Sequence, residues 1–321
     1  MFLKNNQIKN FPISFFSVVM GLSGLTISLQ KAISIFGLSP IIPLIFLYLS
    51  VAIFVILSLI YLLKILLSYH EFVTEFNHPV KINFFPTFSI SLILLSIAFL
   101  SFNFVEISRY FWYIGTVINF IFTLIIINTW MHRDWFNINH MNPSWFIPAV
   151  GNILVPVSGV SHFNQELSWF FFSFGMFFWI ILLAIFLYRI FFHEALIEKL
   201  TPTLFIMIAP PAIGFISYFK LSGVINDFSR ILYYFAIFLT ILMFTQIRIH
   251  SQIKYYLSWW AYSFPLAAVS IASALMYYET KILIYQYLFV ILLLILIYII
   301  AMLFYKTWLE IINKKICIEE N

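Results

Sequence analysis

Long runs of apolar residues, separated by short polar turns, cover almost the whole chain. A helix that spans a bilayer needs about 20 predominantly apolar residues, and runs of that length recur ten times. The pattern predicts an all-α polytopic membrane protein in which ten transmembrane helices form five helical hairpins. The expected spans, which we treat as one transmembrane domain over residues 1–321, lie near residues 12–34, 41–67, 84–102, 107–130, 144–160, 168–191, 203–220, 227–247, 256–277 and 283–307.

Proline and small or polar residues concentrate in the odd-numbered spans, whereas the even-numbered spans contain only Pro40 and Pro43, at the start of the second. Proline kinks a helix, and small residues let helices approach closely. We therefore expect the odd-numbered spans to surround a central path and the even-numbered spans to lie outside. Packing alone is the alternative explanation, since the inner helices of any bundle collect small residues. The candidates for lining the path or kinking its helices are Ser17, Gly21, Pro86, Pro148, Asn152, Pro156, Pro210, Pro211, Gly214, Pro265 and Ser270.

The stretch from Trp259 to Ser270 is apolar enough for lipid but contains Pro265 and two serines. Phe264 precedes this proline, about 10 Å into its span at 1.5 Å per residue, which places it near the middle third of the membrane. A bulky ring there would block a narrow conduit sterically and by dewetting. Phe264 is therefore our candidate gate. The alternative is that Phe264 packs between helices like the other phenylalanines, of which the chain has 40 in all.

Composition supports a membrane protein: 63% of residues are hydrophobic and 9% are charged, against about 25% charged in soluble domains. The net charge of +5 is not evidence of nucleic-acid binding, because basic residues mark the cytoplasmic side of a membrane protein. Twelve of the seventeen lysines and arginines fall on the side of the two termini, which predicts that both termini are cytoplasmic. The five on the opposite side are Lys31, Arg109, Lys220, Arg230 and Lys281.

No acidic or basic residue is expected deep in any span, which disfavours proton relays and sodium sites. A neutral conduit lined by hydroxyl and backbone N–H donors suits small inorganic or organic anions, and weak binding permits rapid release. The single cysteine, Cys317, excludes an internal disulfide. His70-Glu71 lacks the second histidine of a zinc motif, because position 74 is threonine. We expect no metal, no cofactor and no enzymatic activity, because no catalytic constellation is present.

Several motifs resemble the tellurite-resistance/C4-dicarboxylate transporter family, which includes TehA-like proteins and the plant slow-type anion channels. The most specific is Trp260-Ala261-Tyr262-Ser263-Phe264-Pro265 in the ninth span, and a second begins the fifth span at Asn142-Pro143-Ser144-Trp145. The resemblance implies quasi-fivefold symmetry of the five hairpins around a central pore, a homotrimer with one pore per subunit, and anion conduction gated by Phe264. Two departures are the absence of proline between Ser17 and Gly21, and Pro265 where TehA-like proteins have glycine.

Two main functions stay open at this point. The first is an anion channel, and the alternative is a secondary transporter of a C4-dicarboxylate or an oxyanion such as tellurite. A carrier should saturate and exchange, whereas a channel should give unitary currents. No basic residue is expected in the core to clamp a dicarboxylate, which favours the channel. A membrane-embedded enzyme is a third and weaker hypothesis.

Overall fold

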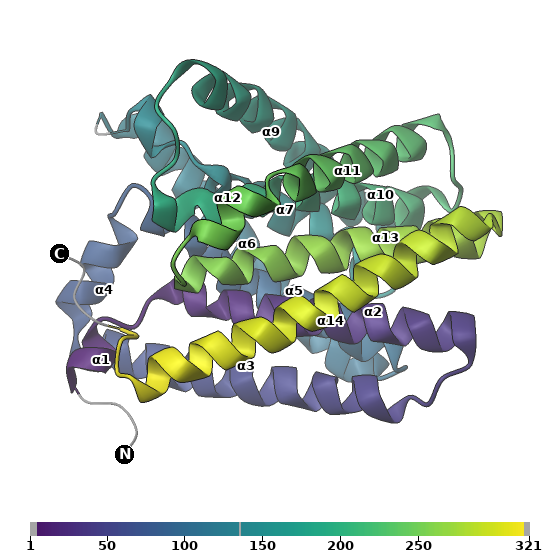
Figure 1. Ribbon diagram of the computed structural model, residues 1–321, viewed down its shortest axis with the longest axis horizontal. Coiled ribbons are helices and arrows are strands. Elements are labelled where there is room, and N and C mark those ends of the chain that lie inside the picture. Colours follow the sequence, from purple (N-terminus) through teal and green to yellow (C-terminus); the bar gives the residue numbers. More distant parts are fainter. Residues whose placement is uncertain (1–4, 135, 318–321) are drawn as a thin grey trace.

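The computed structural model describes residues 5–134 and 136–317, and within them it contains nine helical segments long and apolar enough to span a membrane. The prediction of an all-α polytopic membrane protein is confirmed (Figure 1). The long helices are α2 (Phe16–Phe36), α3 (Ile41–Leu67), α5 (Pro86–Ser101), α6 (Val105–His132), α9 (Gln165–Phe192), α10 (Ala209–Ser222), α11 (Asp227–Thr245), α13 (Ser263–Thr280) and α14 (Leu283–Ile312).

Burial separates the spans into an inner and an outer set. The most hydrophobic windows of the spans that contain α2, α5, α10 and α13 are 72–89% buried, whereas those of α3, α6, α9, α11 and α14 are 28–39% buried. The outer helices expose isoleucine, leucine, phenylalanine and tyrosine. Exposed apolar faces of this extent are typical of a surface that meets lipid. The difference in burial confirms the expected alternation of inner and outer spans for these nine segments.

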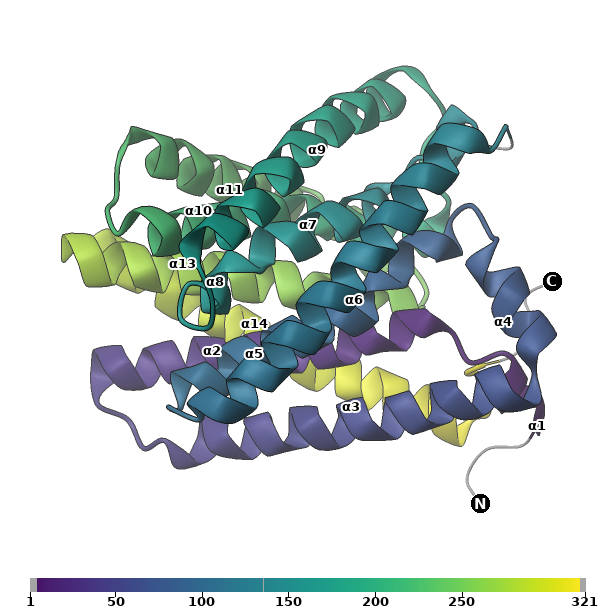
Figure 2. The same ribbon diagram turned by 180° about the vertical axis from the view of Figure 1, so that it is seen from behind.

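The inner elements contact one another in sequence around a closed ring. Helix α2 packs against α5, α5 against α7 (Phe146–Leu154), α7 against α10, α10 against α13, and α13 returns to α2. Each inner element also packs against the outer helix that follows it, so that α2 pairs with α3, α5 with α6, α7 with α9, α10 with α11 and α13 with α14. Figure 2 shows α6 and α9 lying over α5 and α7. The arrangement gives five inner segments with one covering helix each.

The inner segment that corresponds to the fifth predicted span is broken, which explains why it is absent from the nine long helices. Helix α7 ends at Leu154, and a short helix α8 (Pro156–Gly159) starts immediately after Val155. Proline lacks the N–H that would continue the helix, so it is suited to the first turn of a new one. All of α7 and α8 is buried.

Each inner helix is entered through a tight 3₁₀ turn. The 3₁₀ segments η1 (Ile13–Phe15), η2 (Lys81–Phe84), η4 (Pro143–Trp145), η5 (Glu198–Ile208) and η6 (Leu257–Tyr262) precede α2, α5, α7, α10 and α13. A further 3₁₀ segment, η3 (Ile138–His140), lies before η4. Several of the candidate prolines occupy the first turn of the helix that follows, where their missing N–H costs no intrahelical bond. They are Pro86, Pro148, Pro210, Pro211 and Pro265.

The two ends of the bundle differ. Helix α1 (Asn5–Lys9) and the last turn of α14 lie at the same end (Figure 1), which we call the α1 end. At the opposite end, the far end, the inner helices α2, α10 and α13 stop at residues with left-handed backbone conformation: Gly37 (φ 66°), Gly223 (φ 74°) and Lys281 (φ 59°). Such a residue ends a helix by turning the chain back. Two short helices, α4 (Tyr69–Phe76) and α12 (Ile247–Gln252), replace the simple polar turns that we expected between some spans.

Candidate functional site

Two cavities lie within the ring of inner elements, and Phe264 borders both. The first, of about 50 Å³, is lined by the 3₁₀ segments and the first turns of the inner helices, so we call it the α1-end cavity. The second, of about 200 Å³, is lined by the later turns, and we call it the far-end cavity. All five inner segments contribute to each cavity. Phe264 is the only residue common to both lining sets.

Most of the residues that line the cavities form one stripe on each inner segment; the others are Leu100, Leu257, Trp260, Pro265 and Ala267. Successive members lie three or four positions apart, which places them on a single helical face. Four segments share the spacing 3, 3, 4, 3, 4, so that members of the same rank lie at equivalent levels. The stripes are Ser14, Ser17, Met20, Gly24, Ile27 and Lys31; Phe84, Thr87, Ile90, Leu94, Ile97 and Ser101; Ile147, Val150, Leu154 and Val157; Thr203, Ile206, Ala209, Ile213, Ile216 and Lys220; and Ser258, Ala261, Phe264, Ala268, Ile271 and Leu275.

The level that separates the two cavities is apolar. Phe264 has the third rank in its stripe, as Met20, Ile90 and Ala209 have in theirs. The α7 stripe starts one rank later than the others, so its second member, Val150, belongs to the same level. The Phe264 side chain is 6% exposed, although small residues follow it on α13. A phenyl ring has the largest volume at this level, so it fills the space that the other four side chains leave.

Five hydroxyl residues line the α1-end cavity, and the hydroxyls of four of them already donate to backbone carbonyls. The hydroxyl of Ser17 donates to the Ser14 carbonyl over 2.6 Å, that of Thr87 to the Phe84 carbonyl over 2.6 Å, and that of Ser258 to the Lys199 carbonyl over 2.6 Å. Thr203 donates in the same way to Leu200. These side chains therefore present oxygen lone pairs to the cavity rather than hydrogens. The expectation that hydroxyl donors favour anions is wrong for these four residues.

The far-end cavity is not neutral. Lys31 and Lys220 occupy the last rank of the α2 and α10 stripes, and both line this cavity. The sequence analysis counted both lysines toward one membrane side and expected no basic residue deep in a span. The prediction of a neutral conduit is therefore wrong for the far-end cavity. The spacing from Ser17 to Lys31 and from Thr203 to Lys220 is the signal that would have found them.

Three of the candidate residues line a cavity: Ser17, Phe264 and Pro265. Gly21 and Gly214 serve helix packing instead. A Cβ at Gly21 would collide with the Ser263 hydroxyl of α13, and one at Gly214 would lie 3.3 Å from the Met176 sulfur of α9. Ser270 is fully buried, and its hydroxyl has no hydrogen-bond partner among the described residues. It stands outside both lining sets.

Asn152 faces an outer helix. Its amide donates to Thr123 of α6 over 2.8 Å, and its carbonyl oxygen accepts from Asn119 of α6 over 3.0 Å. Ser89 of α5 completes this buried network by donating to Asn119 over 3.1 Å. Pro148 and Asn152 border a small space between α6, α7 and α9. Buried amides need hydrogen-bond partners, and the partners of Asn119 and Asn152 lie on neighbouring helices. The network therefore joins α5, α6 and α7.

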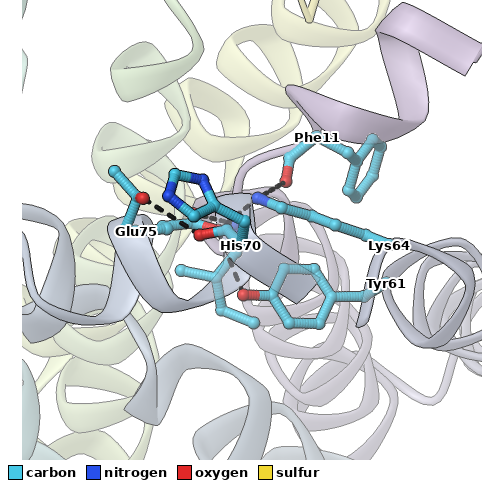
Figure 3. Close-up of polar contacts among 7 residues, drawn as sticks. Phe11, Tyr61, Lys64, His70 and Glu75 are labelled. Atoms are coloured by element: carbon cyan, nitrogen blue, oxygen red, sulfur yellow. Dashed lines mark hydrogen bonds and ion pairs between the residues drawn. The ribbon is translucent and has the colours of Figure 1, made fainter. Parts of the chain in front are cut away.

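A buried ion pair fixes the entrance of α2. Glu75 of α4 accepts hydrogen bonds from the Ile13 N–H over 2.8 Å, from the Tyr61 hydroxyl over 3.1 Å, and from the Lys64 ammonium of α3. Lys64 also donates to the Phe11 carbonyl over 2.9 Å. The two charged side chains are 4% and 6% exposed. Figure 3 shows Tyr61 and Lys64 of α3, Glu75 of α4 and the Phe11 carbonyl before η1 converging on one point. We call Phe11, Ile13, Tyr61, Lys64 and Glu75 the entrance cluster; sequence reasoning missed it.

A family model and individual relatives of this chain point to the same protein family. The model of the voltage-dependent anion channel family matches residues 10–308. An S-type anion channel of Arabidopsis thaliana is 30% identical over 227 residues, which are 70% of this chain and 36% of the plant protein. An uncharacterised transporter of Methanocaldococcus jannaschii is 26% identical over 85% of this chain and 86% of its own. A tellurite resistance protein TehA homolog of Haemophilus influenzae is 23% identical over 85% and 84%.

The match to the family model extends from η1 to the last turns of α14, and so includes all five inner segments and their covering helices. The chain spans about a third of the plant channel but most of the archaeal and bacterial relatives. Members of this family are anion channels and transporters, in agreement with the ring of inner helices and the two cavities along it. The chain belongs to the voltage-dependent anion channel family.

Proposed function

We propose that this chain is an anion channel whose path runs through the α1-end and far-end cavities, and that Phe264 is its gate. One observation carries the proposal: Phe264 alone borders both cavities, at a level where the ring has only apolar side chains. An ion that leaves one cavity for the other must pass this ring. Bulky apolar side chains at a constriction exclude ions sterically and by dewetting.

The sequence of the inner helices suits a ring of this kind. Gly24 of α2 lies so close to α13 that a Cβ would come within 2.6 Å of the Ala267 Cβ. Close approach of the inner helices keeps the path narrow, so a single ring can obstruct it. Because α13 has small residues three and four positions after Phe264, at Ala267 and Ala268, a rotated phenyl ring would find space toward the far-end cavity.

The proposal includes the environment of the channel. We place it in a bacterial inner membrane with both termini cytoplasmic, because basic residues are enriched on their side. The α1 end then faces the cytoplasm. We also propose a homotrimer with one path per subunit and quasi-fivefold symmetry of the inner segments, as the resemblance to TehA-like proteins implies.

The test is to record from purified protein in planar bilayers under a chloride gradient. Phe264→Ala should raise the anion-selective conductance at least tenfold, because removing the ring joins the two cavities. Phe215→Ala is the matched control. Phe215 is a fully buried phenylalanine of the inner helix α10 that packs on Tyr233 of α11, 5.5 Å between ring centroids, and does not line either cavity. It should leave the conductance at the level of the wild type.

Equal conductance of the Phe264→Ala and Phe215→Ala proteins would refute the gate. The carrier hypothesis makes a different prediction: no unitary current from any variant, together with saturable and exchangeable uptake of a labelled C4-dicarboxylate or tellurite into vesicles. The two lysines at the far-end cavity are the observation that keeps this second candidate, since paired cations suit a dicarboxylate.

A further inference from the structure

Lys31 and Lys220 are the two charged residues that line the far-end cavity. They have the same rank in two different stripes, four positions beyond Ile27 and Ile216, and therefore lie at one level of the path. Helices α2 and α10 are not neighbours in the ring, because α13 packs between them. The two ammonium groups thus approach the cavity from separate sides, at the last level before the helices end at Gly37 and Gly223.

Neither lysine has an acidic partner within the part of the chain that the structure describes. In residues 5–134 and 136–317, no ion pair and no hydrogen bond from either ammonium group is found, whereas Lys9, Lys64 and Arg109 each pair with a glutamate. Both lysine side chains line the same cavity. Two like charges that share a cavity repel each other, and an anion between them would relieve this repulsion. An apolar wall strengthens the attraction, because it focuses the field.

We propose that Lys31 and Lys220 form an anion-recruiting site in the far-end cavity, which holds one small monovalent anion between two ammonium groups before it reaches Phe264. The inference rests on the proposed anion pathway and identifies the residues that make its far end selective for anions. Lysine suits this task because its ammonium is a mobile point charge on a flexible stem. A mobile pair binds an anion without enclosing it, so release toward the gate stays rapid.

The first test uses the Phe264→Ala protein, so that the gate does not limit the current. Lys31→Gln and Lys220→Gln should each lower the conductance about threefold or more at ~10 mM chloride, where the Debye length is about 30 Å. The difference should vanish at ~1 M, where that length is about 3 Å. Lys281→Gln is the matched control: this lysine lies at the same end, 4.4 Å above the Tyr278 ring, and does not line the cavity.

Charge is separated from shape by a thiol variant. In a Cys317→Ser background, which removes the native thiol, Lys31→Cys should lose conductance at low chloride. A positively charged methanethiosulfonate reagent should restore it, and a negatively charged one should lower it further. Equal effects of both reagents would overturn the proposal, because a structural role of Lys31 does not depend on the sign of the added charge.

An equilibrium measurement tests the site without any current. At constant ionic strength, replacing gluconate by chloride or nitrate should raise the unfolding midpoint of the wild-type protein in detergent, since a ligand that binds the folded state stabilises it. The rise should disappear in the Lys31→Gln/Lys220→Gln protein and persist in Lys281→Gln. A rise that is unchanged by losing both lysines would overturn the site.

The two failures are distinguishable. If Phe264→Ala conducts and neither lysine variant changes the conductance or the anion-dependent midpoint, the anion channel stands and the recruiting site is wrong. If Phe264→Ala does not conduct but the anion-dependent midpoint requires both lysines, the site stands and the proposed channel is wrong. Succinate, a C4-dicarboxylate, is added to the same unfolding assay. If succinate raises the unfolding midpoint and chloride and nitrate do not, the monovalent site is overturned and a carrier of dicarboxylates is favoured.

Discussion

Replacing Glu75 by glutamine should destabilise the folded protein by about 3–5 kcal/mol, the usual cost of removing one partner from a buried ion pair. All three groups that approach the Glu75 carboxylate are donors: the Ile13 N–H, the Tyr61 hydroxyl and the Lys64 ammonium. A carboxylate accepts from all of them, whereas glutamine offers one oxygen and an NH₂ group. The amide nitrogen would therefore face Lys64 or Ile13, and the ammonium would stay buried without a counter-charge.

Glu71→Gln is the matched control for this experiment. Glu71 belongs to the same helix and pairs with Lys9 over 3.1 Å, but the two side chains are 30% and 43% exposed. Exposed pairs contribute about 0–1 kcal/mol. Both variants remove one carboxylate charge from α4, so the difference between them isolates the effect of burial.

The assay is unfolding by sodium dodecyl sulfate in mixed micelles, followed by tryptophan fluorescence. The Lys64→Met/Glu75→Gln protein should be more stable than Glu75→Gln alone, because it no longer buries an unpaired ammonium group. Coupling between residues in contact amounts to about 0.5–3 kcal/mol. The reasoning is refuted if Glu75→Gln unfolds within 1 kcal/mol of Glu71→Gln, or if the double variant is as unstable as the sum of both single ones.

Two further predictions concern the helix contacts and pH. Gly24→Ala should cost about 1–3 kcal/mol by overpacking against Ala267, and adding Ala267→Gly should recover part of this loss in the same unfolding assay; an additive loss would contradict the close contact. Burial lowers the pKa of His250, a residue of α12 outside the spans, whose Nδ1 lies 3.0 Å from the Tyr262 hydroxyl. The unfolded chain, in which this histidine has its ordinary pKa of about 6.5, binds the proton more tightly than the folded protein. The contribution of His250 to folding stability is therefore full above about pH 6.5 and is lost as the pH falls toward the lower pKa of the folded state. His250→Gln should flatten the unfolding midpoint between about pH 7.5 and 5, whereas His132→Gln, an exposed control, should keep the slope of the wild type.

Hydropathy was sufficient to find the spans, because lipid-facing helices must be apolar over a fixed length. The alternation of inner and outer spans was also accessible, since the inner helices collect glycine, serine and proline for close packing. The fifth span shows the limit. Its length fits one helix, yet Pro156 starts a second helix after Val155. A composition count does not reveal where a proline lets a helix begin again.

The direction of a side chain was harder to predict than its burial. Asn152 is buried as expected, but it lies two residues after Val150 and two before Leu154, which are members of the α7 stripe. Each residue of a helix rotates the side-chain direction by about 100°, so side chains two residues apart point to nearly opposite sides. The Asn152 amide therefore faces α6 and not the cavities. Ser270 has the same relation to Ala268. The stripe, rather than polarity, distinguishes residues that line the cavities from residues that join helices.

Pairs distant in the sequence were not predictable at all. Lys64 and Glu75 are 11 residues apart in different helices, and their partners Phe11 and Ile13 come from the chain's start. Each residue alone resembles loop polarity beside a membrane span. Only the folding of α4 back onto α3 makes the cluster, and a turn of that kind carries no periodic signal.

The distribution of polar groups along the path bears on how a member of this family can be selective for anions. The ring at Phe264 is apolar, and the hydroxyls of Ser17, Thr87 and Ser258 in the α1-end cavity donate to backbone carbonyls, so the path from this cavity to the ring has few groups that bind an anion tightly. Selection by coordination would need donors there. Under our proposal the choice is instead made at the far end, by the field of Lys31 and Lys220, before the ion reaches the gate. Such a path discriminates strongly by charge and weakly among anions of similar size, and its preference for anions should weaken as salt screens the field.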